Sequence, residues 1–452
     1  MNENKTTETE YFSRLPIAQA AFPAPFPSVL EFNAPAHGTW NIVHMGMLVP
    51  ESHQIYVCAA NCMRGVVLTA AEMNMIHRFS SVILTEKDLE DGTIEETTVQ
   101  GIIDILHRLP KLPPMVMVFT VCLHHFAGCS QKVIYDRLEE AFPTVDFVRC
   151  TMDPIMRKHH SPDEKLRKSM LDVLEPLPVK KGVVTLLGSD FLIGDDGDLQ
   201  RWLADRGLEL RQLPACSTYE DYKKLAEAEC FISVYPNAKY GAELLAKRLG
   251  RKHLYLPSCF SYEEILDQRS RLEAFLQENA AGYREKDPKE DIVEIADGIA
   301  ECERLLGQAK GLIGETAIAI DYTLHPRPLG LARWLLSHDF RVKEVYLDAV
   351  NGEEEQDFYW LQEHAPELML SATVHPDCRL RSREGHGKVL ALGQKAAWFT
   401  GTKHFVNVVE GAGWQGFAGM QAMIKEMIEA FRQEKDPEDL IPRKGLGCES
   451  CI

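Results

Sequence analysis

Strand-like and helix-like segments alternate along almost the whole chain, and this alternation restricts the fold more than any other feature of the sequence. Residues 95–109 place their apolar side chains on one helical face, and the apolar run at 115–121 (MVMVFTV) is typical of a strand buried on both faces. A second helical segment at 130–142 and a second strand at 145–150 follow. Strands that alternate with helices pair into parallel sheets, so the sequence predicts an α/β fold.

The alternation starts again twice, which indicates more than one domain. It resumes at 182–188 (GVVTLLG) and at 316–320 (TAIAI), and the charged stretch 263–308 predicts helices interrupted at Asp287-Pro288. A chain of 452 residues is also longer than one hydrophobic core usually supports. We predict three Rossmann-like domains with parallel sheets flanked by helices: residues 31–178, 179–310 and 311–435, after an irregular N-terminal arm (1–30) and before a polar C-terminal tail (436–452).

The net charge and the N-terminal sequence indicate which binding partners and which cellular compartment to expect. A formal net charge of −18 argues against nucleic acid or an anionic membrane as the main partner. The sequence has no apolar run long enough to cross a bilayer, and its first residues lack the features of a signal peptide, so we expect a cytoplasmic protein. In such a protein the twelve cysteines are expected to be thiols or metal ligands rather than a disulfide framework.

Four of these cysteines fall where a parallel sheet collects ligands, beyond the carboxyl ends of its strands. Cys58 ends the apolar segment QIYV, and Cys62 lies near the first turn of a helix predicted at 59–76. Cys122 follows the strand at 115–121, and Cys129 precedes the next helix. The four thiols could bind a metal or fill space in the core, and the residues alone leave both readings open. The C-x3-C and C-x6-C spacings differ from the usual zinc spacing, which favours iron–sulfur among the metal readings.

Several short segments resemble one known family. The segment SHQIYVCAAN carries His53 and Cys58 five residues apart, and FTVCLHHFAGCS carries Cys122 at the end of a strand. The segments LLGSDFLIGDDGDLQ and GAGWQGFAGMQAMIKEM follow later in the chain. Together these segments resemble the nitrogenase component 1 family, whose architecture is also three Rossmann-like domains. The resemblance implies an anaerobic iron–sulfur protein that receives electrons from an ATP-dependent iron-protein reductase, and a homodimer or a heteromer with a related component 1 subunit.

The sequence departs from that family at the cluster. The family has a further cluster cysteine about twenty-five residues before the position of Cys58, where this chain reads EFNAPAHGTW. We therefore expect Cys58, Cys62, Cys122 and Cys129 to form a compensating set for an iron–sulfur cluster, either [4Fe–4S] or larger. The cluster could lie within one subunit or be shared with a partner. Two more thiols in the tail could add ligands or form a mobile dithiol pair: Cys448 and Cys451.

A second departure concerns the nitrogenase cofactor. Its anchoring cysteine and histidine would fall near Val234 and Ala412, and neither residue type is present there. We therefore do not expect dinitrogen reduction at a molybdenum-type cofactor. Three residues fall where the resemblance places a cavity between the domains, and they could line a substrate site or be ordinary packing: Tyr235, Lys239 and Trp414.

The leading functional hypothesis is an electron-transfer reductase subunit acting on an unknown substrate, with no catalytic residue assigned. The alternative is a non-catalytic scaffold on which a metal cluster or cofactor is assembled. A plain ligand-binding α/β protein with structural thiols is a third reading. The turn GSDFLIGDDGD argues against a dinucleotide, because its four aspartates would repel a pyrophosphate. The absence of a P-loop motif from the sequence agrees with an external ATPase.

Overall fold

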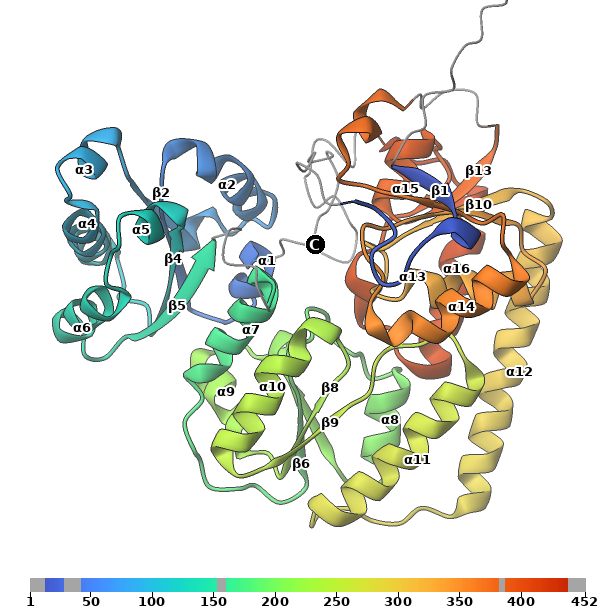
Figure 1. Ribbon diagram of the computed structural model, residues 1–452. Coiled ribbons are helices and arrows are strands. Elements are labelled where there is room, and N and C mark those ends of the chain that lie inside the picture. The colour runs from blue at the N-terminus through green and yellow to red at the C-terminus, as the bar shows by residue number, and fades with distance from the viewer. Residues whose placement is uncertain (1–12, 28–41, 153–159, 382–386, 438–452) are drawn as a thin grey trace, which may run out of the picture.

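The computed structural model describes residues 13–27, 42–152, 160–381 and 387–437. In these ranges three sheets lie in three separate units (Figure 1). Their strand orders are β3-β2-β4-β5, β7-β6-β8-β9 and β1-β12-β11-β10-β13-β14. All neighbouring strands run parallel except β1, which pairs antiparallel with β12. The predicted α/β architecture is confirmed.

The first unit contains a sheet covered on both faces. Its strands are β2 (His53–Cys58), β3 (Phe79–Ile83), β4 (Met115–Val121) and β5 (Asp146–Met152). Its helices are α1 (Ile42–Met47), α2 (Met63–Glu72), α3 (Glu86–Glu90), α4 (Ile94–Arg108), α5 (Cys122–Phe126), α6 (Gln131–Ala141) and α7 (Pro162–Asp172). Every residue of β2 and β4 is buried, and alternate side chains enter two different cores, because helices lie against both faces.

The second unit repeats this pattern and ends in two long helices. Its strands are β6 (Val183–Leu186), β7 (Glu209–Gln212), β8 (Cys230–Ser233) and β9 (Lys252–Tyr255). Its helices are α8 (Asp198–Asp205), α9 (Tyr219–Lys223), α10 (Pro236–Leu249), α11 (Tyr262–Asn279) and α12 (Pro288–Ile313). The predicted helix break is confirmed, because Asp287 caps α12 by accepting a hydrogen bond from the Lys289 amide at 2.9 Å.

The third unit contains the largest sheet. Its strands are β10 (Ala317–Asp321), β11 (Val342–Tyr346), β12 (Met369–Ser371), β13 (Val389–Leu392) and β14 (Phe405–Val406), with β1 (Arg14–Pro16) at one edge. Its helices are α13 (Pro328–Ser337), α14 (Glu355–His364), α15 (Gln394–Thr400) and α16 (Gly416–Arg432). The arm is therefore not wholly irregular, because residues 14–16 extend this sheet. Single 3-10 turns complete the elements: η1 (Ile17–Gln19), η2 (Ala60–Cys62), η3 (Ile76–Arg78), η5 (Leu213–Ala215), η6 (Lys224–Glu227), η7 (Gly352–Glu354), η8 (Pro376–Leu380) and η9 (Glu410–Gly413).

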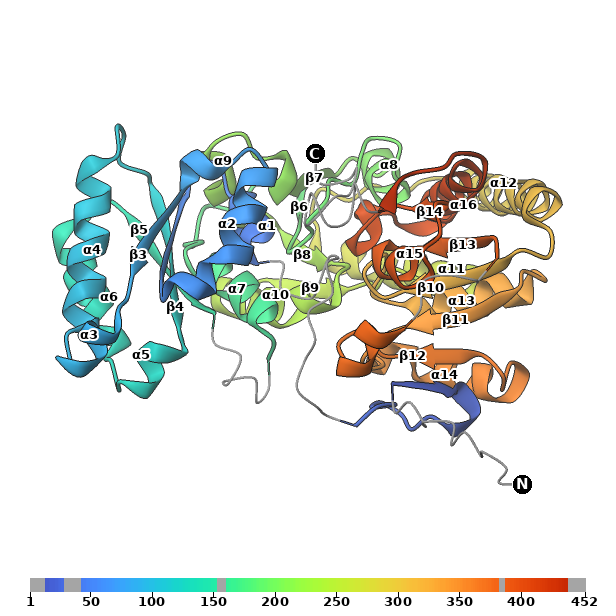
Figure 2. The ribbon, with the colours of Figure 1, turned by 90° about the horizontal axis from the view of Figure 1, so that it is seen from above.

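Two helices join the units. Helix α7 packs against α10, which connects the first unit to the second. Helix α12 runs along the outside of the second and third units and packs against α16 (Figures 1 and 2). The predicted domain boundary at residue 310 falls inside α12, and no break in the chain marks it.

In each sheet the first of the parallel strands along the chain lies inside the sheet. The next strand is added on one side of it, and a later strand is added on its other side. These central strands are β2, β6 and β10. Ligand sites in such sheets form beyond the carboxyl ends of the strands at this switch point. Within the described ranges, no helix is both long enough and apolar enough to span a bilayer.

Candidate functional site

The thiols of the first unit lie at its switch point. In the pairing of β2 with β4, Val57 is opposite Thr120, so Cys58 reaches the level of the residue just before Cys122. Cys62 is the N-cap residue of α2, as the sequence predicted for a thiol near the start of a helix. Two neighbouring strand ends and one helix start therefore supply Cys58, Cys122 and Cys62 to one edge of the sheet.

The pKa of two of these thiols responds to another thiol of the set. Burial and the charge of a Cys62 thiolate raise the pKa of Cys58 to about 12. Burial and the charge of Cys122 raise the pKa of Cys62. Cys58 is buried, Cys122 is half-buried and Cys62 is exposed, so the set extends from the core to the surface. A bound cation would reverse these shifts, because it favours thiolates.

Cys129 packs against a different core from Cys58. It packs beside the core that contains Val116 and Val118, and its pKa is raised by burial and by Glu95. Among the residues that the structure describes, no group of three or more His, Cys, Asp or Glu side chains has the geometry of a metal site. The donor chemistry of Cys58, Cys62 and Cys122 fits an iron–sulfur group, and a fourth donor would have to join them. Cys448 and Cys451 lie outside the described residues.

His124, two residues after Cys122, is fully used by the protein. Its Nδ1 accepts a hydrogen bond from the Val121 amide at 3.3 Å, so in the neutral ring Nε2 carries the proton. The Thr98 hydroxyl donates to the Ile94 carbonyl at 2.7 Å and can accept from Nε2 at 3.0 Å. Burial lowers the pKa of His124, in agreement with a neutral ring. His124 therefore holds the start of α5, which carries Cys122, and has no nitrogen left for a metal.

His53, at the start of β2, is also held by a neighbouring strand. Its Nε2 lies 2.8 Å from the Ser80 hydroxyl. Burial and the nearby Arg78 lower the pKa of His53 to about 4. The imidazole is therefore neutral at pH 7 and sits five residues before Cys58, at the opposite end of the strand.

A second cluster of chemical groups fills the junction of the three units. Arg167 of α7 is 1% exposed, and its guanidinium pairs with Asp163 at 3.0 Å and with Asp190 at 2.5 Å. It also donates to the Gly188 carbonyl and lies over the Tyr235 ring, 4.6 Å from its centroid. Burial opposes the charge of Asp190, but Arg167 holds the pKa of Asp190 well below its usual range. Burial raises the pKa of Asp163.

The third unit enters this junction through the turn at Glu410–Gly413. The Tyr235 hydroxyl donates to the Glu410 carboxyl group, which links the second unit to the third. Burial and the nearby Asp190 raise the pKa of Glu410 to about 8. Four consecutive residues of the turn have positive φ: Glu410 (53°), Gly411 (73°), Ala412 (46°) and Gly413 (73°). Two of them are not glycine, so the backbone is strained at this point.

Tyr235 and Trp414 line one small cavity at this junction, together with Val234, Gly411 and Gly413. Its volume of about 20 Å³ is room for a single water molecule. Lys239 is not among its lining residues; its ammonium group lies 5.2 Å from the centroid of the Tyr255 ring. The positions matched to the family's cofactor anchors thus lie beside a nearly closed space.

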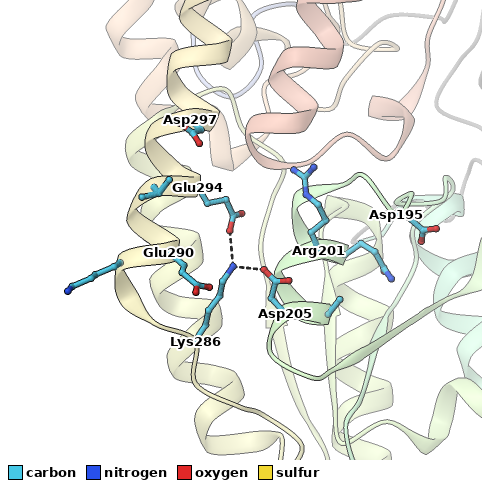
Figure 3. A pocket seen from close by; sticks show the side chains of 11 residues that line it. Asp195, Arg201, Asp205, Lys286, Glu290, Glu294 and Asp297 are labelled. Carbon is cyan, nitrogen blue, oxygen red and sulfur yellow. Dashed lines mark hydrogen bonds and ion pairs between the residues drawn. The ribbon is translucent and has the colours of Figure 1, made fainter.

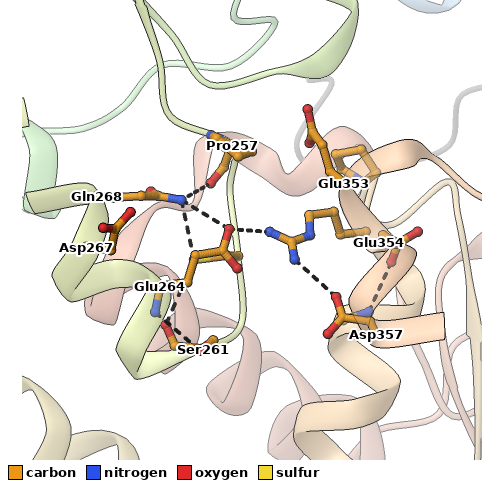
Figure 4. A network of polar contacts seen from close by, with 12 residues as sticks. Pro257, Ser261, Glu264, Asp267, Gln268, Glu353, Glu354 and Asp357 are labelled. Atoms are coloured by element: carbon orange, nitrogen blue, oxygen red, sulfur yellow. Dashed lines mark hydrogen bonds and ion pairs between the residues drawn. The ribbon is translucent and has the colours of Figure 1, made fainter. Parts of the chain in front are cut away.

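Two larger clefts lie away from these groups. The first, of about 860 Å³, lies between α8 and α12, and Figure 3 shows Lys286 reaching both Asp205 and Glu294. The second, of about 820 Å³, adjoins Arg327, which joins Glu264 of α11 at 2.5 Å to Asp357 of α14 at 3.1 Å (Figure 4). The cationic groups named here are paired within the protein, so both clefts contain ion pairs that join helices.

Glu354, in the network of Figure 4, is a buried carboxyl group at the start of α13. It accepts hydrogen bonds from the Leu329 amide at 2.7 Å and the Gly330 amide at 3.0 Å. Burial raises the pKa of Glu354 to about 8 despite these bonds. The side chain therefore occupies the helix N-terminus where an external anion would otherwise bind.

Sequence reasoning did not find Arg167 or Glu410. The Asp163–Arg167 pair has the i, i+4 spacing of an exposed helical ion pair, and only the fold buries it. The sequence places Asp190 in an acidic turn that would repel a phosphate, and in the structure its carboxylate pairs with Arg167. The one local signal for the turn was GAG, two glycines flanking an alanine, at residues 411–413.

Comparisons with known proteins agree with this fold. Two solved structures, "Nitrogenase Cp1 at pH 6.5" and "Nitrogenase Cp1 at pH 5", are similar to this chain, with TM-scores of 0.64 and 0.58. The first is 12% identical and the alignment covers 90% of this chain and 94% of that one; the second is 14% identical, with 95% and 96% covered. No curated protein sequence matches. The family model described as nitrogenase component 1 type oxidoreductase matches residues 48–375, which is more than half of the chain. The protein therefore belongs to the nitrogenase component 1 type oxidoreductase family.

Proposed function

We propose that this chain is an iron–sulfur electron-transfer subunit of a nitrogenase component 1 type reductase, and that Cys58, Cys62 and Cys122 bind its cluster. The supporting observation is the placement of these three thiols at the carboxyl edge of the first sheet, after β2, after β4 and at the start of α2. Thiolates are the usual ligands of iron–sulfur clusters, and such a cluster, when bound, accepts and donates single electrons. The protein contributes the ligands, the buried surroundings of Cys58 and the neutral His124 that fixes the start of α5.

The exposed side of the thiol set suits contact with another chain. Cys62 is exposed, and Phe126, at the far end of the short helix that begins with Cys122, is 64% exposed. An exposed aromatic side chain on the helix that begins with Cys122 favours a protein partner over open solvent. We propose a second copy or a related component 1 subunit as this partner. An ATP-dependent iron protein supplies the electrons.

A cubane needs a fourth ligand, and two sources are available. Cys129 is close in sequence, but its loop must move to bring its sulfur to Cys122, because it now packs against the core beside Glu95. The other source is a cysteine of a partner chain. Iron content of a Cys129→Ala variant distinguishes the two: loss of iron assigns the ligand to this chain, and retained iron assigns it elsewhere.

Anaerobic purification tests the proposal directly. The wild-type chain should be brown and carry iron, with about four atoms per chain for a single cubane. Cys58→Ala and Cys122→Ala should lose most of this iron. Cys230→Ala is the matched control, because Cys230 is also a buried thiol in a parallel strand but lies in the second unit. Equal iron in all three variants, or iron-free wild-type protein that folds normally, contradicts the ligand assignment.

A scaffold for cluster or cofactor assembly is the second candidate function. The small volume of the inter-domain cavity, about 20 Å³, favours it, because an organic substrate has no room there in this conformation. Repeated turnover separates the two functions. A reductase oxidises its reduced iron protein many times when substrate is present, whereas a scaffold transfers its cluster to an acceptor once.

A further inference from the structure

The second and third units are closed against each other by a short turn. The turn Glu410–Gly413 follows β14 and enters the space beyond β6 and β8. A Cβ atom added to Gly413 would lie 2.7 Å from the Leu192 carbonyl oxygen, so backbone meets backbone here. The Ser258 hydroxyl donates to the Trp414 carbonyl at 2.9 Å from the other side. The contact leaves a cavity of only about 20 Å³.

The conformation of this turn is held by its neighbours. Positive φ at Glu410 and Ala412 is unfavourable for residues with a Cβ atom. Two hydrogen bonds fix the backbone: the Glu410 amide donates to the Thr323 carbonyl at 2.8 Å, and the Gly411 amide donates to the Leu324 carbonyl at 2.7 Å. Strain of this kind persists only where the surrounding structure over-determines it.

The Glu410 side chain makes the contact across the two units. Glu410 is half-buried, and its carboxyl group accepts a hydrogen bond from the Tyr235 hydroxyl. The Tyr235 ring in turn lies over Arg167, which is paired with Asp163 and Asp190. One bond between two side chains therefore connects the strained turn to the ion pairs of α7.

We propose that the Tyr235–Glu410 contact is a latch that holds the turn 410–413 against the second unit, and that the junction admits a ligand only when this contact opens. The proposal explains why the space beside Val234 is almost filled although it lies between the second and third units. It does not depend on the thiols, so it stands or falls separately from the proposed cluster.

The charges around Glu410 determine how opening of the Tyr235–Glu410 contact depends on pH. Asp190, Asp163 and Arg167 act on the charge of Glu410, Glu410 in turn acts on Tyr322 of the third unit, and His325 lies beside Gly411. In the closed contact burial raises the pKa of Glu410 to about 8, and exposure to water returns the carboxyl group toward its ordinary pKa. Opening therefore releases a proton. The opening equilibrium should rise up to tenfold per pH unit between about pH 5 and pH 8 and become constant above pH 8.

Hydrogen exchange of the full chain measures this opening. The readout is the protection of the amides of residues 408–416, corrected at each pH for intrinsic exchange, from pH 5.5 to pH 9. Wild-type protection should fall toward pH 8 and then remain constant. Glu410→Gln keeps a neutral acceptor but cannot titrate, so its protection should not vary with pH. Tyr235→Phe keeps the ring over Arg167 and removes the bond, so its opening should rise by roughly fivefold at every pH.

Tyr283→Phe is the matched control. The Tyr283 hydroxyl also donates to a glutamate, Glu273, at 2.8 Å, but neither residue lines the junction. This variant should keep wild-type protection in residues 408–416. Wild-type protection that does not change with pH overturns the proposal, as does a Glu410→Gln variant that titrates like wild type. If Glu410→Gln does not fold, equal protection in Tyr235→Phe and Tyr283→Phe overturns it.

Discussion

The switch point of the first sheet and the junction of the three units use the same kind of position for opposite purposes. At the first, three thiols from two strand ends and a helix start are neighbours, and Cys62 remains exposed. At the junction, the residues beyond the strand ends are paired with one another, and Arg167 is almost completely buried. The first place offers thiols as metal ligands, and at the second an arginine is already paired with two carboxyl groups.

This difference indicates that the first sheet is suited to binding a ligand and that the junction is suited to holding the units together. The raised pKa values of Cys58 and Cys62 mean that their thiolates gain from a bound cation, which none of these thiols supplies. A buried arginine between two carboxyl groups gains nothing from a further ion, because its charge is already compensated. In this family member, metal chemistry is therefore expected at the first sheet, and control of access is expected at the junction.

The largest effect should come from removing the central charge of the junction. Arg167→Met leaves Asp163 and Asp190 buried without their cation, which costs about 3–5 kcal/mol of unfolding free energy. Arg201→Met is the control, because Arg201 pairs with Asp198 at 2.7 Å but its side chain is 51% exposed, and the expected loss is about 0–1 kcal/mol. Urea unfolding followed by circular dichroism measures both. Similar losses in the two variants would show that the junction is not a buried ion-pair centre.

Lowering the pH should destabilise the first unit through His53. Because the pKa of His53 is lowered to about 4 in the fold, the unfolded chain binds a proton below about pH 6.5 that the folded chain does not. The contribution of His53 to the free energy of unfolding therefore falls by roughly 2–3 kcal/mol as the pH falls from about 6.5 to 4. The urea midpoint at pH 4.5 and pH 7 should differ less in His53→Gln than in wild type. His107→Gln, at an exposed position of α4, should keep the wild-type difference.

The contrast between the two regions also explains what the sequence could reveal. Cys58 and Cys122 were placed correctly at strand ends because apolar runs define β2 and β4 locally. The strands β3, β9 and β13 were not predicted from the sequence. The strands β3 and β9 are only partly buried, which weakens their apolar pattern, and β13 is a buried apolar run of only four residues. The role of Arg167 was missed for a different reason. Its partner Asp190 and the Tyr235 ring are brought to it by tertiary packing, and no local pattern records that.

A smaller effect should come from the support beneath Cys122. Thr98→Val keeps the shape of the side chain but leaves the buried Nε2–H group of His124 without its acceptor, which costs about 1–3 kcal/mol. The control is Thr97→Val on the same helix, where the hydroxyl bonds Asp88 at 2.7 Å near the surface and the expected cost is about 1 kcal/mol or less. If His124 holds the thiol loop as described, Thr98→Val should also retain less iron than Thr97→Val. A cost at Thr98 no larger than that at Thr97 would remove His124 from this role.

The smallest effect should be a gain, and it tests the strain at the junction. Ala412 has φ of 46°, a conformation that costs an alanine about 1–2 kcal/mol and a glycine almost nothing. Ala412→Gly should therefore raise the unfolding free energy by about 0.5–1 kcal/mol after the entropy cost of glycine is subtracted. Ala422→Gly, inside α16, should lower it by about 1 kcal/mol, because a helix disfavours glycine. The two variants carry the same chemical change, so opposite signs in urea unfolding can come only from the backbone at each site. Equal losses would mean that the turn stores no strain, and the closure of the junction would then depend on the side chains of Tyr235 and Glu410 alone.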